Sequence, residues 1–229
     1  MVGSAVKYEE KQKEPALNLY TYFRSSASFR VRIVLNLKQQ AYTHTAVHML
    51  RNGGEQHASA YRAVNPQGLV PSLETDEGPV LTQSIAICEF LEETYPEPRL
   101  LPEDRFERAW VRSVCSAIAC DIHPINNLRV LKYLKTELKH SEEEKTKWYR
   151  HWIDAGFEGI EKMIAARAGR YCLGDQVTLA DAFLVPQVWN ALRFECPLDR
   201  FPTIDSVYKN AIALEAFALA APGAQPDAE

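Results

Sequence analysis

The pattern of apolar and polar residues changes period near residue 25, which predicts a strand followed by a helix. Positions 17–22 alternate between apolar and polar side chains, whereas Phe29, Ile33 and Leu37 recur every four residues, as on one face of a helix. Three serines lie between the two patterns: Ser25, Ser26 and Ser28. Serines just before an apolar helical run are typical N-caps, and the free amides and positive dipole end there favour an anion.

The next seventy residues predict a small α/β domain. A second strand is expected at 42–47, and a polar loop with a short irregular helix at 51–62. Pro66 and Gly68 indicate a turn, Pro71 opens a short strand, and 76–78 forms a hairpin turn into 80–82. A helix beginning at Gln83 and Ser84 ends before Pro96.

The remainder of the chain predicts an all-helical domain. Three prolines between 96 and 102 indicate a linker, taken as 96–103. Helices are expected at 105–138 with a break at Pro124, at 142–168, at 178–194 after a turn at Gly174, and at 204–218. Thr178 and Asp181 have the spacing of a capping box. We expect residues 1–15 to be a disordered extension and 223–229 to be a frayed tail.

Composition excludes several classes of protein. The 229 residues are 46% hydrophobic, which is enough for well-formed cores, and a net charge of −4 gives no general footprint for nucleic acid or anionic membranes. No apolar run approaches the roughly 20 residues of a membrane span, and the charged segment 1–15 does not resemble a signal peptide. The five scattered cysteines favour a reducing, cytoplasmic compartment and lack a metal-ligand spacing, so no metal is expected.

A thiolate is one anion that the serine-rich helix start could stabilise. Lowering a thiol pKa from about 8.5 to about 6.5 requires roughly 2.7 kcal/mol. A helix N-terminus contributes about 0.3 to 1 kcal/mol, and one hydrogen bond to a charged group adds roughly 1.5 to 3 kcal/mol. One serine hydroxyl together with the helix start therefore suffices. The alternative from the residues alone is that these serines only cap the helix.

Several motifs in this order resemble the glutathione S-transferase family. They are Ser25-Ser-Ala-Ser-Phe-Arg-Val-Arg32, Val70-Pro71, Gln83-Ser84, the proline-rich linker and Thr178-Leu-Ala-Asp181. The resemblance is closest to the zeta class, whose members act as maleylacetoacetate isomerases. The segment 121–129 is similar to bacterial zeta-like enzymes that include maleylpyruvate isomerases. The resemblance implies a thioredoxin-like, glutathione-binding α/β domain at 16–95 and an all-α substrate domain at 104–222, in a homodimer.

The same resemblance implies a set of site residues. It implies that Ser25, Ser26 and Arg193 are catalytic. It implies that glutathione is bound by Ser25, Gln56, Val70, Pro71 in a cis peptide bond, Gln83, Ser84, His123 and Asn127. Substrate carboxylates are expected at Arg24, Arg129 and Arg193, because a guanidinium binds a carboxylate bidentately. Arg30 and Arg32 are expected to be helix-surface charges or domain contacts. Ala27 stands where many zeta enzymes have cysteine.

The function implied is glutathione-dependent cis–trans isomerisation of a dicarboxylate ketoacid. The thiolate adds to the conjugated double bond, the bond rotates, and the thiolate leaves, so that glutathione is a cofactor. Maleylacetoacetate of aromatic amino acid catabolism is the first substrate expected, and maleylpyruvate of gentisate catabolism is the alternative. Two other functions remain as alternatives. One is a general glutathione transferase that acts on small electrophiles, and the other is a non-catalytic binding module of the same fold.

Overall fold

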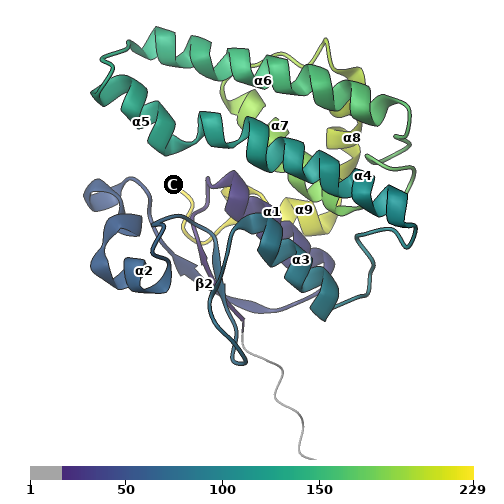
Figure 1. The fold of residues 1–229 in the computed structure, drawn as a ribbon, viewed down its shortest axis with the longest axis horizontal. Coiled ribbons are helices and arrows are strands. Elements are labelled where there is room, and N and C mark those ends of the chain that lie inside the picture. The colour runs from purple at the N-terminus through teal and green to yellow at the C-terminus, as the bar shows by residue number, and fades with distance from the viewer. Residues whose placement is uncertain (1–16) are drawn as a thin grey trace, which may run out of the picture.

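The computed structural model describes residues 17–229 and contains a small sheet domain beneath a larger helical domain (Figure 1). The sheet has the order β2-β1-β3-β4, with β1 parallel to β2 and antiparallel to β3. The elements of this domain are β1 (Leu17–Thr21), α1 (Ser26–Leu37), β2 (Tyr42–Ala46), α2 (Ser59–Val64), β3 (Ser72–Glu74), β4 (Leu81–Thr82) and α3 (Ser84–Thr94). Short 3-10 turns at Arg51–Gly53 and Glu55–His57 precede α2.

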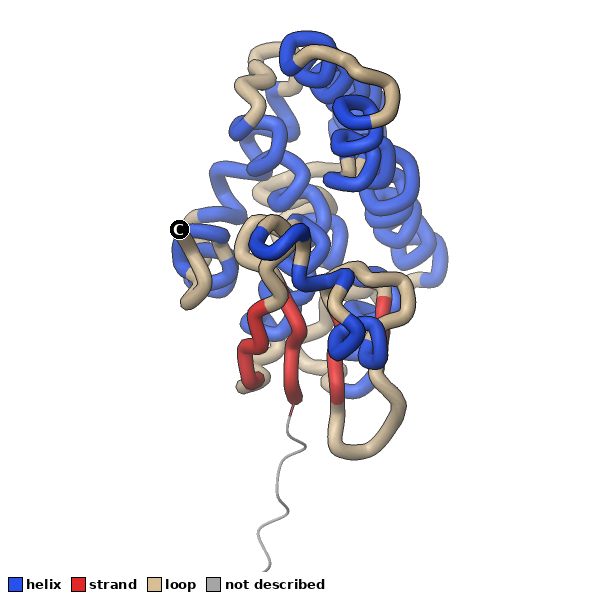
Figure 2. Tube along the Cα trace, turned by 90° about the vertical axis from the view of Figure 1, so that its left-hand side faces the viewer, coloured by secondary structure: helices blue, strands red, loops and turns tan. Residues whose placement is uncertain are grey.

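The helical domain follows the proline-rich linker. Its helices are α4 (Arg105–Ser116), α5 (Leu128–Thr136), α6 (Glu142–Ala165), α7 (Leu179–Arg193), α8 (Pro202–Ile212) and α9 (Glu215–Ala220). Between α4 and α5 the chain forms a π-helical turn at Ala117–Ile122 and a 3-10 turn at Pro124–Asn126, so the predicted break at Pro124 is confirmed. In Figure 2 the strands lie together at the base, with the long helices on the side away from them.

The capping box predicted at Thr178 and Asp181 is present at the start of α7 and is buried. The Asp181 carboxylate accepts from the Thr178 amide at 2.8 Å and from the Cys172 amide at 2.8 Å, and its side chain is fully buried. These bonds satisfy donors at the start of the helix and at the preceding turn. They hold the first turn of α7, the helix that ends at Arg193.

Helix α1 joins the two domains. It packs against α3 on one side and against α7 and α9 on another, so it is buried on nearly every face. Arg32 is fully buried there and donates to the carbonyls of Phe23 and Ala220 at 3.0 Å each and to Thr21 Oγ1 at 3.0 Å. The expectation of a surface arginine is wrong, and the expected domain contact is confirmed.

Two sequence predictions near the C-terminus are wrong. The single helix expected at 204–218 is two helices, because Leu214 adopts an extended conformation (φ −76°, ψ 136°) and its carbonyl accepts from the first turn of α9. The tail expected to be frayed instead packs on the sheet domain: Asp227 Oδ2 accepts from the Phe23 amide at 3.0 Å. The predicted extension 1–15 lies outside the described residues.

Candidate active site

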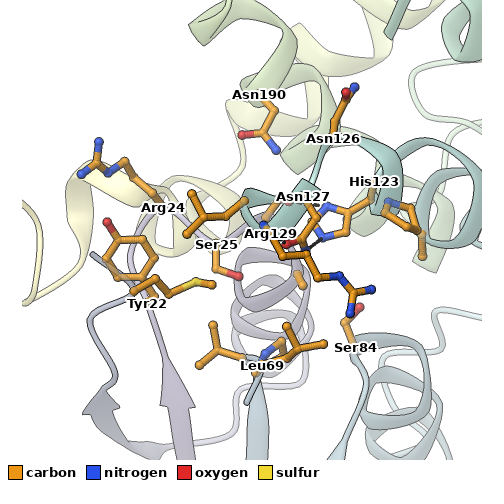
Figure 3. Close-up of a pocket in the computed structure, with 18 of the residues that line it drawn as sticks. Tyr22, Arg24, Ser25, Leu69, Ser84, His123, Asn126, Asn127, Arg129 and Asn190 are labelled. Atoms are coloured by element: carbon orange, nitrogen blue, oxygen red, sulfur yellow. Dashed lines mark hydrogen bonds between the residues drawn. The ribbon is translucent and has the colours of Figure 1, made fainter. Parts of the chain in front are cut away.

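A cavity of about 270 Å³ lies between the two domains, lined by residues of both (Figure 3). The sheet domain contributes the turn between β1 and α1, the Val70-Pro71 turn and the first residues of α3. The helical domain contributes the π-helical turn, the start of α5, and parts of α6 and α7. Eleven predicted site residues line it: Arg24, Ser25, Ser26, Val70, Pro71, Gln83, Ser84, His123, Asn127, Arg129 and Arg193.

Ser25 stands at the start of α1 and is its N-cap. Its Oγ accepts from the Ser28 amide at 3.2 Å, and its backbone is extended (φ −71°, ψ 114°). Capping uses a lone pair of the hydroxyl and leaves its proton free to donate. Capping and thiolate stabilisation are therefore compatible in one residue, and the positive end of α1 faces the same position.

Ser26, His123 and Asn127 form a hydrogen-bonded chain across the domains. Ser26 Oγ lies 3.0 Å from His123 Nδ1, and Asn127 Nδ2 lies 3.4 Å from His123 Nε2. Asn127 Oδ1 accepts from the Arg129 amide, so its Nδ2 is a donor and His123 Nε2 must accept. The His123 proton is then on Nδ1, where it donates to Ser26 Oγ.

Burial keeps His123 neutral. It lowers the pKa of His123 to about 3, and the nearby guanidinium groups of Arg30 and Arg129 act in the same direction. A neutral imidazole that already holds two partners is poorly placed to transfer a proton at neutral pH. Its part in the site is to hold Ser26 and Asn127 in fixed positions, and Ser26, with its own hydroxyl proton free, can donate to a ligand.

The start of α3 presents an anion-binding arrangement. Gln83, just before the helix, has a positive φ of 70°, a strained conformation for a residue with a side chain. Ser84 follows as the first helical residue and is buried, with its Oγ accepting from Arg30 Nη1 at 3.1 Å. Free helix amides and a serine hydroxyl with its proton available form a binding site for a carboxylate.

Arg30 is not a helix-surface charge, whereas the alternative expectation, a contact between the domains, is confirmed. It is only 1% exposed, lines the cavity, and stacks over the Phe183 ring at 4.9 Å. Its Nε and Nη2 atoms have no hydrogen-bond partner, and burial lowers its pKa to about 10, so it remains charged at neutral pH. The periodicity of α1 gave no signal for this burial, because α7 of the other domain covers that face.

The Val70-Pro71 peptide bond is cis, as the resemblance implied, and both residues line the cavity. Gln56 does not: it is buried beside the cavity wall, with its Nε2 3.2 Å from His57 Nε2. Its predicted contact with glutathione rested on the resemblance alone, and Gln56 is not among the residues that line the cavity.

Three arginines predicted for substrate binding surround the cavity with different orientations. Arg193, the last residue of α7, stacks over Phe194 and interacts with the Tyr149 hydroxyl, and partial burial lowers its pKa. Arg24 stacks over Phe23 at 4.8 Å, and its guanidinium turns away from Ser25 (Figure 3). Arg129 is exposed at the start of α5, immediately after the Asn127 cap.

Polar cavity residues on the helical domain were missed by the sequence analysis. Tyr149 belongs to α6, and Gln187 and Asn190 belong to α7, where nothing in the sequence indicates that they face a cavity. Four of the five cysteines are buried, and Cys120 is exposed in the π-helical turn. Among residues 17–229, no group of His, Cys, Asp and Glu could hold a metal ion, and no helix is long and apolar enough to span a membrane.

The sequence of this chain matches two models of one protein family. Residues 19–99 match the family model "Glutathione S-transferase, N-terminal domain", and residues 125–217 match "Glutathione S-transferase, C-terminal domain". The chain belongs to the glutathione S-transferase family. Within it, the chain is similar to zeta-class enzymes, as the motifs predicted.

Three relatives carry the narrower similarity. A "Probable maleylacetoacetate isomerase" of Vibrio cholerae is 52% identical over 93% of this chain and 99% of its own length. The holo structure of a bacterial zeta-class maleyl pyruvate isomerase matches with a TM-score of 0.89 at 46% identity, covering 93% of this chain and all of the other. A maleylacetoacetate isomerase of Anaeromyxobacter dehalogenans with bound GSH matches with a TM-score of 0.85 at 41% identity, covering 94% and 99%.

The Anaeromyxobacter enzyme was also solved with dicarboxyethyl glutathione and citrate in the active site, and that structure matches at 38% identity with a TM-score of 0.83, covering 94% of this chain and 98% of the other. The prediction of family and fold is therefore confirmed.

Proposed function

We propose that this protein is a glutathione-dependent isomerase that converts maleylacetoacetate to its trans isomer, fumarylacetoacetate. The observation that carries the proposal is that one cavity holds both the Ser25 hydroxyl at the start of α1 and several guanidinium groups from two domains. The first arrangement suits a thiolate, and the second suits an acidic substrate whose reaction develops further negative charge.

The residues present fit glutathione as the cofactor. Arg30 is a buried cation with two donor atoms, Nε and Nη2, that have no protein partner, and an anionic ligand would offset the cost of burying its charge. Ser84 and the free amides of α3 lie beside it and would receive the γ-glutamyl carboxylate. The Val70 backbone before the cis-proline would pair with the cysteinyl unit, which brings the thiol towards Ser25.

Bound glutathione supplies a thiolate that adds reversibly to the conjugated double bond, which permits rotation and is followed by release of the thiolate. The protein's part is electrostatic. Ser25 donates a hydrogen bond from its hydroxyl to the thiolate and, with the start of α1, keeps the thiol ionised at neutral pH. Arg193 holds a substrate carboxylate and offsets the charge that develops on the carbonyl oxygen.

The comparisons support this assignment over conjugation or pure binding. Relatives named as isomerases cover almost the whole chain. The dicarboxyethyl glutathione in the Anaeromyxobacter enzyme carries a thioether bond to a four-carbon diacid, which is the connection that thiolate addition makes in isomerisation and in conjugation alike. A non-catalytic binding module would have no need for Ser25, Ser84 and the arginines in one cavity.

Maleylpyruvate is the second candidate substrate, because a maleyl pyruvate isomerase is similar over nearly the whole chain. The two ketoacids share the cis double bond and differ beyond one carbonyl. A conjugating transferase would share the glutathione site but retain glutathione in its product. We further propose a homodimer acting in the cytoplasm, in aromatic amino acid catabolism.

One experiment tests the proposal. Each ketoacid is followed by its ultraviolet absorbance with and without glutathione, while mass spectrometry follows free glutathione. Isomerisation that requires glutathione without consuming it is the expected result, faster with maleylacetoacetate. Faster turnover of maleylpyruvate would assign the other pathway. Consumption of glutathione without isomerisation would contradict the proposal.

A further inference from the structure

The last residues of the chain are bound to the turn that carries Ser25. Gln225 is buried and its Nε2 donates to the carbonyls of Leu219 at 2.8 Å and Ala221 at 2.9 Å, which directs the segment back towards the sheet domain. Asp227 then reaches the first turn of that domain, where its Oδ2 accepts from the Phe23 amide at 3.0 Å. Figure 1 marks the C-terminus beside the sheet domain, close to α1.

The turn held in this way is the connection between β1 and α1. Ser25 donates its amide to the Tyr22 carbonyl at 2.9 Å, which closes a tight turn with Phe23 at its bend. The Phe23 carbonyl accepts from Arg32 at 3.0 Å, and the Phe23 amide donates to Asp227. The two polar groups of Phe23 are thus held from opposite sides, one by α1 and one by the C-terminal segment.

Further contacts tie the same segment to β2 and the loop after it. His44 Nε2 lies 3.0 Å from Asp227 Oδ1, and the Asp227 side chain is 11% exposed. Glu229 pairs with Arg51, and its Oε2 lies 3.5 Å from His48 Nε2. A largely buried carboxylate that accepts a backbone amide makes a strong, short-range bond, whereas the exposed Glu229 pair contributes little.

We propose that Asp227 is a positioning residue of the active site, which holds the β1–α1 turn so that the Ser25 hydroxyl meets the glutathione thiolate. Without the carboxylate, the Phe23 amide loses its acceptor and the turn is restrained from the Arg32 side alone. Ser25 follows Phe23 by two residues, so a shift of this turn moves its hydroxyl and weakens a bond that depends on geometry. The inference rests on the proposed function, since it assumes glutathione beside Ser25.

The test compares Asp227→Ala, Asp227→Asn and the control Asp154→Ala in the full chain. Asp154 is an exposed carboxylate on α6 that pairs with Arg200, so its loss removes an acid without touching the turn. The ionisation of bound glutathione is titrated by thiolate absorbance in the binary complex, with no ketoacid present. Amide hydrogen exchange of residues 22–25 reports the turn independently of any ligand.

We expect Asp227→Ala to raise the pKa of the bound thiol by about half to one unit and to lower kcat/KM for glutathione roughly three- to tenfold, with faster amide exchange at Phe23. Asp227→Asn keeps an acceptor of about half the strength and should fall between Asp227→Ala and the unchanged protein. Asp154→Ala should match the unchanged protein in every measurement.

An unchanged thiol titration in Asp227→Ala, despite faster exchange of the turn, would overturn the inference and leave the segment a structural strap only. If Asp227→Ala does not fold, the titration of Asp227→Asn decides, and a curve identical to the unchanged protein would likewise overturn it. Failure of the unchanged protein to bind or ionise glutathione would instead contradict the proposed function.

Discussion

The Arg30 guanidinium donates to the Ser84 hydroxyl at 3.1 Å, which joins a fully buried cation on α1 to the first residue of α3. This bond leaves the Ser84 proton free and leaves two Arg30 atoms, Nε and Nη2, without partners. The pair therefore has one proton on the Ser84 hydroxyl, one on Arg30 Nε and two on Arg30 Nη2 to offer an anion at the start of α3. Arg30 has a different role from Arg32, two positions further along the same helix, whose donors bind protein acceptors.

Substituting Arg30→Met should weaken glutathione binding about ten- to hundredfold, because a hydrogen-bonded charge opposite the ligand carboxylate is lost. The free energy of unfolding without ligand should stay the same or rise, since a buried cation without an acid partner is removed. Calorimetric titration with glutathione and denaturant unfolding measure the two effects.

Arg32→Met is the matched control for this change. It leaves Thr21 Oγ1 and the buried carbonyls of Phe23 and Ala220 without their donor, so it should lower the free energy of unfolding by about 2 to 4 kcal/mol. A loss of unfolding free energy in Arg30→Met as large as that in Arg32→Met would show that Arg30 is a structural residue and not a ligand contact.

Substituting Ser25→Ala should lower kcat at neutral pH about ten- to hundredfold, because the thiolate loses its hydrogen-bond donor. Glutathione affinity should change by less than about threefold, since one contact among many is lost. The rate should recover at higher pH, where the thiol ionises without help. Steady-state kinetics across pH, with the dissociation constant from calorimetry, measure these effects.

Loss of the helix cap also lowers the free energy of unfolding by about 1 kcal/mol, so a control for stability is needed. Ser141→Ala removes the equivalent cap of α6, where Ser141 Oγ accepts from the Glu144 amide at 3.1 Å, and Ser141 does not line the cavity. It should lose similar stability and keep full activity. Equal turnover of Ser25→Ala and Ser141→Ala at neutral pH would remove Ser25 from catalysis.

Substituting Arg193→Ala should raise the KM for the dicarboxylate substrate about tenfold or more, because the bidentate partner of one carboxylate is lost. Glutathione affinity should remain the same. Arg200→Ala is the control, since Arg200 is an exposed arginine that pairs with Asp154 and Glu158 outside the cavity. A KM in Arg193→Ala equal to that in Arg200→Ala would place Arg193 among the surface charges.

Elements with local signals were predictable from the sequence. Alternation predicted β1, hydroxyl and carboxyl caps predicted the starts of α1 and α7, and Pro124 predicted the break before α5. Each of these signals acts within a few residues, through steric limits on the backbone or through satisfaction of the first amides of a helix. Motifs with such local geometry, including Ser25 and Ser84, were also found in the cavity.

Features that depend on distant parts of the chain were not predictable. Arg30 looks solvent-facing from the periodicity of α1, and it is buried because α7 covers it more than 140 residues later, at Phe183. Asp227 meets Phe23 across 204 positions of sequence, and nothing in the composition of a short polar tail indicates such a contact. Tyr149 and Asn190 enter the cavity only because of how α6 and α7 pack.

The neutral His123, half-buried in the wall of the cavity, predicts how the free energy of unfolding depends on pH. Burial lowers the pKa of His123 to about 3 in the folded protein, against about 6.5 when unfolded, so the unfolded state binds the proton first as pH falls. Above the unfolded pKa, His123 has no effect on the free energy of unfolding. Below about pH 6.5 it lowers that free energy by about 1.4 kcal/mol for each pH unit, because only the unfolded state binds the proton. Between pH 7 and pH 5 the loss is about 2 kcal/mol.

Substituting His123→Asn should remove this part of the pH dependence while lowering stability at pH 7, since the contacts with Ser26 and Asn127 change. Guanidinium unfolding at pH 7 and pH 5 measures both proteins, and the free energy of the unchanged protein should fall about 2 kcal/mol more than that of the variant. His151→Asn, at an exposed histidine on α6, should behave as the unchanged protein. The same loss in all three proteins would show that the pKa of His123 is not lowered in the folded protein, and the prediction would be wrong.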